Sequence, residues 1–298
     1  MNDVAKELYL LGCNILKNES LKLHTTFKIG GKVPLFVIPK TKNIFVKTLN
    51  YLIEKRINFK IIGEGANLII NDNDLNFIVV STEYLTNITL GNEYIFAESG
   101  VPISRLSYFA MENGLSGLEF AAGIPGSLGG ALFMNAGAYN GQISDVIEEV
   151  EAYDLKEKKI ILLNKKEIGF DYRKSIFQKR RYISLRAKLK LFKDKKENIE
   201  KKMKELSLKR WEKQPLEYPS AGSIFKRPKP DFYVGTTIEK LGLKGFSIGD
   251  AEISNKHAGF IINKGNATFS DVMNIIEHVK KTVKEKYGED LEVEPEIW

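Results

Sequence analysis

The chain has 298 residues, enough for two or three domains, and its hydrophobic and charged fractions of 43% and 28% are typical of a globular protein. No apolar run approaches the roughly 20 residues that span a bilayer, and the amino-terminal residues lack the order of a secretory signal. We therefore expect a cytoplasmic protein with no membrane contact. The net charge of +7 fits a nucleic-acid surface or a site for small polyanions, and the interspersed charges of residues 193–213 favour an exposed amphipathic helix over nucleic-acid binding.

The first lobe is predicted to mix strands and helices. An amino-terminal helix precedes paired glycines at 30–31, which suggest a tight turn, and a strand–helix–strand unit follows. The predicted elements are a strand at 35–38, a helix over 41–56 and strands at 59–62, 68–70 and 77–80. We place the end of this lobe at residue 81, so that it covers residues 1–81.

A second lobe, residues 82–213, is predicted to contain more paired strands, and a third, residues 214–298, follows the basic helix. The second lobe's elements are strands at 88–90 and 94–97, a helix over 102–113, a hairpin of 147–154 with 160–163, and a strand at 182–191. The third lobe's elements are a strand at 258–263, a helix over 270–287 and a terminal strand. The helix over 270–287 carries one continuous apolar stripe, which predicts a buried face.

Residues that bind metals are scarce. Cys13 is the only cysteine and lies in an apolar run, so we expect an inert packing residue and no disulfide. The three histidines, His24, His257 and His278, are far apart and lack the spacing of metal ligands. The sequence therefore predicts no metal site.

Two glycine-rich segments could contact a ligand. The segment Gly63-Glu64-Gly65-Ala66-Asn67 is no dinucleotide fingerprint, because the third glycine is missing and a strand follows it; a plain turn and a phosphate-binding loop both remain open. The segment 121–139 has five glycines in 19 residues, against 24 in the whole chain. Because glycine lets a backbone approach a ligand closely, we interpret this long, flexible loop as a ligand-binding segment.

Three further segments carry polar groups that could act on a ligand. Arg173 lies between aromatic residues and suits a carboxylate or phosphate, although a surface arginine in a turn fits equally well. Ser223 follows small residues, but a structural serine is the default because no hydrolase motif surrounds it. Alternation places Glu292, Glu294 and Glu296 on one face of a terminal strand, where a solvated edge is the ordinary explanation.

Together these segments resemble the UDP-N-acetylenolpyruvoylglucosamine reductase family, FAD enzymes of bacterial peptidoglycan precursor synthesis. The matching motifs are Thr25-Thr26-Phe27 with Gly30-Gly31, Gly63-Glu64-Gly65-Ala66-Asn67, Gly123-Ile124-Pro125-Gly126 with Gly129-Gly130, Asn135-Ala136-Gly137-Ala138-Tyr139, Tyr172-Arg173-Lys174-Ser175, Ala221-Gly222-Ser223-Ile224-Phe225-Lys226 and Glu294-Pro295-Glu296. Each motif is weak alone, but seven in the expected order, over nearly the whole chain, are specific.

The resemblance implies an α+β fold. A vanillyl-alcohol-oxidase-type FAD-binding domain, of the PCMH type, would form two lobes, and a smaller α+β substrate domain would follow at residues 214–298. The implied activity is that of a flavoprotein oxidoreductase with non-covalent FAD and NADPH as hydride donor. Its substrate would be UDP-N-acetylglucosamine enolpyruvate and its product UDP-N-acetylmuramate. We expect a monomer that binds these small molecules.

The resemblance also implies roles for residues. Ser223 matches the family's proton donor, and Arg173 and Glu296 match the pair that polarises the enolpyruvyl carboxylate. The expected cofactor contacts are Gly63, Gly65, Ala66, Asn67, Ile124, Pro125, Gly126, Gly130 and Ala136. The expected substrate contacts are Tyr172, Lys213, Lys226, Arg227 and His257.

Two departures from the family pattern affect these expectations. Ala66 replaces the more usual serine, which removes one hydroxyl contact to the cofactor diphosphate. No extended tyrosine-bearing insertion lies between residues 182 and 222, which indicates the shorter subclass. Two other functions remain open. A flavin oxidase of the same fold would leave Ser223 and Glu296 without a role, and a basic nucleotide- or nucleic-acid-binding protein would be colourless when purified.

Overall fold

The computed structural model describes residues 1–179 and 181–298, which form two compact units. Unit 1 comprises residues 1–19, 34–64 and 76–209, and unit 2 comprises residues 20–33, 65–75 and 210–298. Both units therefore draw on segments that are far apart in the sequence. Among the described residues, no helix combines the length and the apolar character needed to cross a membrane.

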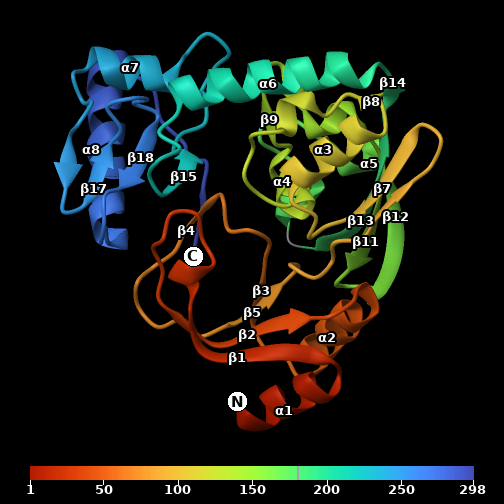
Figure 1. Ribbon diagram of the computed structural model, residues 1–298. Helices are drawn as coiled ribbons and strands as arrows, with labels where there is room; N and C mark the ends of the chain where they lie inside the picture. The colour runs from red at the N-terminus through yellow and green to blue at the C-terminus, as the bar shows by residue number, and fades with distance from the viewer. Residues whose placement is uncertain (180) are drawn as a thin grey trace. The chain divides into compact units, whose positions relative to one another are not determined.

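The first sheet of unit 1 has the strand order β1-β2-β5-β3, in which β5 pairs in parallel with both β2 and β3 (Figure 1). Its strands are β1 (Cys13–Ser20), β2 (Lys32–Pro39), β3 (Phe59–Ile62) and β5 (Ile78–Ser81), and helices α1 (Asn2–Leu10) and α2 (Lys42–Glu54) belong to the same part of the chain. The predicted strand–helix–strand unit is confirmed as β2, α2 and β3. Thr41 begins α2 by accepting a hydrogen bond from the backbone N–H of Ile44 at 3.2 Å.

The second sheet of unit 1 is antiparallel, with the order β12-β11-β13-β7-β6. Its strands are β6 (Ile88–Leu90), β7 (Tyr94–Glu98), β11 (Ile147–Asp154), β12 (Lys159–Asn164) and β13 (Tyr182–Lys190). The predicted hairpin is confirmed as β11 and β12. Helices α3 (Ile103–Glu112), α4 (Leu128–Met134) and α5 (Lys165–Ile168) share a hydrophobic core with this sheet (Figure 1).

Side chains of helix α2 contact both sheets of unit 1. The hydroxyl of Tyr153, a buried residue of β11, donates a hydrogen bond to Asn50 of α2. Lys42, at the start of α2, forms an ion pair with Glu151 of β11 at 2.6 Å. Cys13 is buried in the same core, as expected of a packing residue.

The glycine-rich segment 121–139 is not the flexible loop expected from its composition, because residues Leu128–Met134 form α4. Ser127 precedes this helix, and its hydroxyl accepts a hydrogen bond from the N–H of Gly130 at 3.4 Å. Burial of Leu128 and Leu132 stabilises the helix against the low helix propensity of its paired glycines.

Unit 2 contains an antiparallel sheet with the order β15-β18-β17-β16. Its strands are β15 (Ser220–Ser223), β16 (Ser247–Ile248), β17 (Ala251–Ile253) and β18 (Phe260–Asn263), and its helices are α7 (Val234–Lys240) and α8 (Phe269–Tyr287). A reciprocal cap between Thr268 and Asp271 begins α8, and the predicted apolar stripe of this helix is buried. The basic helix is confirmed as α6 (Lys196–Lys213), and the chain passes from unit 1 to unit 2 within it.

The remaining strands form short pairs. They are β4 (Leu68–Ile69) with β19 (Glu296–Ile297), β8 (Leu115–Ser116) with β14 (Phe192–Lys193), and β9 (Gly137–Ala138) with β10 (Gly141–Gln142). The terminal strand is confirmed as β19, but it is shorter than expected. Glu292 and Glu294 lie outside it, and the side chain of Glu292 pairs with Lys226 instead of lining a strand edge.

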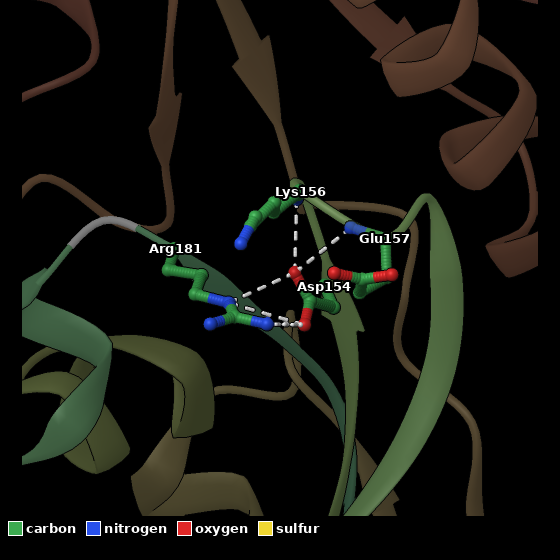
Figure 2. A network of polar contacts seen from close by, with 4 residues as sticks. All are labelled: Asp154, Lys156, Glu157 and Arg181. Carbon is green, nitrogen blue, oxygen red and sulfur yellow. Dashed lines mark hydrogen bonds and ion pairs between the residues drawn. The ribbon is translucent and has the colours of Figure 1, made fainter.

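A buried charge closes the turn between β11 and β12 in unit 1. The carboxylate of Asp154 accepts hydrogen bonds from the Arg181 guanidinium, the shortest 2.6 Å long, and from the backbone N–H groups of Lys156 and Glu157 (Figure 2). Asp154 is buried, whereas Arg181 is partly exposed. The hydrogen bonds from Arg181 lower the pKa of Asp154 to about 2.

Arg181→Met should destabilise the protein. The substitution leaves the buried Asp154 carboxylate with only backbone donors, at a cost of about 1–3 kcal/mol in the free energy of unfolding. Denaturant titration at neutral pH measures this cost. Lys204→Met removes an exposed ion pair with Glu200 on α6 and serves as the control, with little expected change. Equal stability of wild type and Arg181→Met would contradict the assignment.

The same pair predicts how stability depends on pH. Asp154 has a pKa of about 2 in the folded protein, against 3.8 for an unperturbed aspartate. A carboxyl group with a lowered folded pKa contributes its stabilisation above pH 3.8 and loses it as the pH falls toward about 2. The stability difference between wild type and Arg181→Met should therefore be complete at neutral pH and shrink across that acidic range. A difference that stayed constant there would show that Asp154 does not titrate in this way.

Candidate active site

In unit 1, the turn after β3 packs directly against the glycine-rich segment. A Cβ atom on Gly63 would lie 2.1 Å from the Oγ atom of Ser127, so a larger residue at position 63 could not keep this contact. The carboxylate of Glu64 accepts a hydrogen bond from the N–H of Gly126 at 2.9 Å. The structure thus brings together Gly63 and Ile124–Gly126, which the sequence predicted as cofactor contacts.

Internal packing accounts for part of the glycine content of residues 121–139. A Cβ atom on Gly129 would lie 3.0 Å from the Cβ of Ser99, and one on Gly137 would lie 2.6 Å from the carbonyl oxygen of Gly141. Gly126 has a φ of 123°, which side-chain-bearing residues rarely adopt. Gly130 differs, because it is exposed and a Cβ there would make only ordinary contacts.

The exposed part of this segment fits a large, flat ligand such as a flavin. Gly123, Pro125 and Gly130 are exposed and have side chains that project little or not at all. Ile124 and Ala136 are partly buried against the core of unit 1. The N–H groups of Ile124, Gly126 and Gly130 already donate within the protein, so the segment offers a ligand a surface with small side chains.

In unit 2, the residues that follow Glu64 pack closely against the segment containing Thr26. Gly65 has a φ of 63°, and a Cβ atom on it would lie 2.1 Å from the carbonyl oxygen of His24. The N–H of Thr26 donates to the Gly65 carbonyl at 3.3 Å, and the Thr26 hydroxyl donates to the Ser220 carbonyl at 2.7 Å. Thr26 thereby connects the Gly65–Asn67 turn to strand β15, and Ala66 remains partly exposed.

The carboxy-terminal strand pairs with the residues after this turn. Strand β19 runs parallel to β4, and the N–H of Glu296 donates to the Asn67 carbonyl at 3.0 Å. The Asn67 side-chain amide donates to the Glu294 carbonyl at 3.3 Å. A predicted cofactor contact, Asn67, and a predicted catalytic residue, Glu296, therefore lie next to each other.

Ser223 is carried to the same region of unit 2 by strand β15. Ser223 pairs with Phe260, and a bulge with Gly222 at a φ of 79° separates it from the preceding pair of residues. The N–H of Glu294 donates to the Ile224 carbonyl at 2.8 Å. The backbones that carry Ser223 and Glu296 are therefore neighbours. Within the described part of the chain, the Ser223 hydroxyl makes no hydrogen bond.

Arg173 belongs to unit 1 and occupies the tip of a tight turn. Asp171 and Lys174 exchange backbone hydrogen bonds of 3.1 and 3.0 Å, with Tyr172 and Arg173 between them. Arg173 has a φ of 53°, the left-handed conformation that ordinarily favours glycine. Its guanidinium lies 5.4 Å from the centre of the Tyr172 ring and donates to the Gly137 carbonyl at 3.3 Å.

Asn135 holds this turn, a role that sequence reasoning missed. It is buried at the carboxyl end of α4 with a φ of 44°. Its amide donates to the Asp171 carbonyl at 3.0 Å and accepts from the N–H of Ser144 at 3.1 Å. Asparagine tolerates the left-handed conformation that ends helices, so its place directly after α4 is the signal that could have found it.

The four predicted substrate contacts in unit 2 differ in their surroundings. Lys213 is exposed at the end of α6, and Lys226 forms an ion pair with Glu292 at 2.5 Å. The Arg227 guanidinium lies 4.4 Å from the centre of the Tyr233 ring. The Nδ1 atom of His257 accepts a hydrogen bond from the N–H of Gly259 at 3.0 Å, and burial lowers the pKa of His257. Because Nδ1 accepts this hydrogen bond, the neutral imidazole carries its proton on Nε2, which is the donor that remains.

Comparison with protein families gives two matches along the chain. Residues 33–161 match an FAD binding domain. Residues 214–298 match the carboxy-terminal domain of UDP-N-acetylenolpyruvoylglucosamine reductase. The first range includes the glycine-rich segment, and the second includes Ser223 and Glu296.

Relatives with the name UDP-N-acetylenolpyruvoylglucosamine reductase cover nearly the full length of the chain. The Petrotoga mobilis protein is 56% identical, over 99% of this chain and 98% of its own length. The Thermotoga sp. strain RQ2 protein is 51% identical, over 100% and 98%. The crystal structure of the Thermus caldophilus reductase superposes with a TM-score of 0.81 at 31% identity, over 96% of this chain and 98% of that one. The chain is therefore an FAD-dependent oxidoreductase that belongs to the UDP-N-acetylenolpyruvoylglucosamine reductase family.

Proposed function

We propose that this protein uses NADPH to reduce UDP-N-acetylglucosamine enolpyruvate to UDP-N-acetylmuramate, a step in peptidoglycan precursor synthesis in the cytoplasm. The observation that carries the proposal is the backbone pairing in unit 2 that makes the segments of Ser223 and Glu296 neighbours. A flavin oxidase that only reacts with oxygen would have no use for this pair. We further propose that residues 1–81 and 82–213 serve as the FAD-binding lobes, that residues 214–298 form the substrate domain, and that the protein acts as a monomer.

The reaction adds a hydride to one alkene carbon and a proton to the other. Bound FAD would accept a hydride from NADPH and supply it to C3 of the enolpyruvyl group. Negative charge then develops toward the carboxylate, and addition is slow unless that charge is stabilised. The protein must therefore bind the carboxylate and deliver a proton to C2.

Arg173 is suited to the carboxylate because its guanidinium is always charged and offers two parallel N–H donors. The turn of Asp171 and Lys174 holds its backbone in one conformation, which reduces the freedom lost when substrate binds. Glu296 can assist only if it carries or shares a proton, since a second negative charge would oppose the reaction. We assign both residues to stabilisation of the enolate-like charge.

Ser223 is suited to proton delivery, since its hydroxyl makes no hydrogen bond within the described residues. A serine hydroxyl is a weak acid and donates only to a strongly basic carbon, such as C2 after hydride addition. This requirement delays protonation until the hydride has been transferred, so that Ser223 acts in the second half of the reaction only.

The remaining contacts follow the charges of the ligands. We assign the diphosphate of the sugar nucleotide to the cationic side chains Lys213, Lys226 and Arg227, which complement its charge. Lys226 would exchange its Glu292 partner for a phosphate. We assign a polar contact with substrate to the Nε2 donor of His257, and a packing contact to the exposed ring of Tyr172.

Ser223→Ala should separate the two half-reactions. Flavin reduction by NADPH should keep its wild-type rate, because Ser223 takes no part in it. Flavin reoxidation by the enolpyruvyl sugar nucleotide should slow by about 10²- to 10⁴-fold, the usual contribution of a general acid. Stopped-flow absorbance under anaerobic conditions measures both rates.

Ser220→Ala on the same strand is the matched control, because it removes a hydroxyl from β15 without changing the proposed donor. Both half-reactions should persist in that variant. If Ser223→Ala slowed flavin reduction by NADPH as much as flavin reoxidation, the assigned role of Ser223 would be wrong.

A further inference from the structure

The backbone at Arg173 is in a conformation that its residue type disfavours. Arg173 has a φ of 53°, in the left-handed region that glycine and asparagine adopt with least strain. Such a residue keeps this conformation only where its surroundings hold it, and these positions concentrate at functional sites. The contacts that hold the Arg173 backbone therefore bear on its function.

Gln178 makes the side-chain contact with the Arg173 backbone. It lies in the short 3₁₀ helix Ile176–Lys179, and its Nε2 atom donates to the Arg173 carbonyl at 2.9 Å. The same nitrogen donates to the Phe133 carbonyl, near the end of α4, at 3.2 Å. The Sδ atom of Met134 lies 3.7 Å from the same nitrogen. Because all three neighbours are acceptors, only the NH₂ end of the amide can face them. Its two hydrogens thus connect the Arg173 peptide to α4.

This contact constrains the arginine rather than the turn as a whole. Asn135 fixes the start of the turn through the Asp171 carbonyl, and Ser175 donates to the Phe133 carbonyl at 2.8 Å. Gln178 alone among these side chains donates to the Arg173 carbonyl. The N–H of Lys174 belongs to the same peptide and donates to the Asp171 carbonyl at 3.0 Å. Gln178 adds the side-chain hydrogen bond to the carbonyl end of that peptide, and the two contacts together fix the direction in which the guanidinium leaves the backbone.

We propose that Gln178 is a positioning residue for Arg173, orienting the guanidinium for the carboxylate of an enolpyruvyl substrate. The inference rests on the proposed function, since it needs Arg173 to act on that carboxylate. Gln178 contacts no reacting atom. Its effect is confined to the step in which Arg173 takes part.

The test uses variants of position 178 that differ in their donors. Gln178→Glu keeps the shape and replaces the NH₂ donors by oxygen, which repels both carbonyls. Gln178→Met removes the donors without adding a charge. Gln178→Lys restores an N–H donor on a side chain of similar reach. Ser175→Ala, the matched control, removes a different hydrogen bond to the same Phe133 carbonyl and leaves the Arg173 carbonyl untouched.

We expect Gln178→Glu and Gln178→Met to slow flavin reoxidation by the enolpyruvyl sugar nucleotide about 10- to 100-fold, as a misplaced catalytic group does. The loss should appear in kcat more than in KM, and flavin reduction by NADPH should change less than about twofold. Gln178→Lys should recover most of the rate, and Ser175→Ala should retain it. FAD content and NADPH reduction, measured on the same samples, report whether unit 1 is folded.

Wild-type reoxidation rates in both Gln178→Glu and Gln178→Met would overturn the inference. So would an equal slowing of both half-reactions, or loss of FAD from both variants, since each indicates a merely structural residue. Arg173→Lys shows whether a negative result concerns the positioning role of Gln178 or the proposed function itself. If Arg173→Lys impairs reoxidation and the Gln178 variants do not, only the role of Gln178 is wrong. If Arg173→Lys has no effect, the assigned role of Arg173 is wrong.

Discussion

The carboxyl end of helix α4 holds the turn of Arg173, and the placement of this arginine in unit 1 depends on that connection. Asn135 reaches the first residue of the turn, while the Phe133 carbonyl accepts hydrogen bonds from Ser175 and Gln178 just beyond it. The other end of the same helix begins at Ser127, against which Gly63 packs. One short helix thus connects the backbone suited to a flavin with the arginine suited to a carboxylate.

Unit 2 contains an equivalent constraint built mainly from backbone pairing. The carboxy-terminal residues pair on one side with β4 and on the other with the residues after Ser223. Neither contact depends on a long or mobile side chain, so the positions of Ser223 and Glu296 are set by strand pairing. This rigidity suits proton transfer, in which donor and acceptor must approach within hydrogen-bond distance.

The sequence predicts those parts of the fold that show a local pattern. The apolar stripe of α8 and the hairpin pattern of β11 and β12 predict their elements, because both patterns depend only on neighbouring residues. Helix α4 escapes prediction because Gly129 and Gly130 lower helix propensity, and tertiary burial outweighs that preference. Family motifs predict Ser223, Arg173 and Glu296 as candidates, but no local pattern predicts the pairing of Asn67 with Glu296 or the contact of Gln178 with Arg173. Those contacts arise only when the chain folds.

In the proposed reaction, electrons pass through FAD to an enolpyruvyl ether rather than to oxygen. The most direct measurement follows flavin absorbance under anaerobic conditions, first with NADPH and then with UDP-N-acetylglucosamine enolpyruvate. NADPH should bleach the flavin and the sugar nucleotide alone should restore its colour, with one lactyl ether formed for each flavin reoxidised. A flavin that stayed bleached with the sugar nucleotide and regained its colour only when oxygen was admitted would show that the protein does not reduce the enolpyruvyl ether.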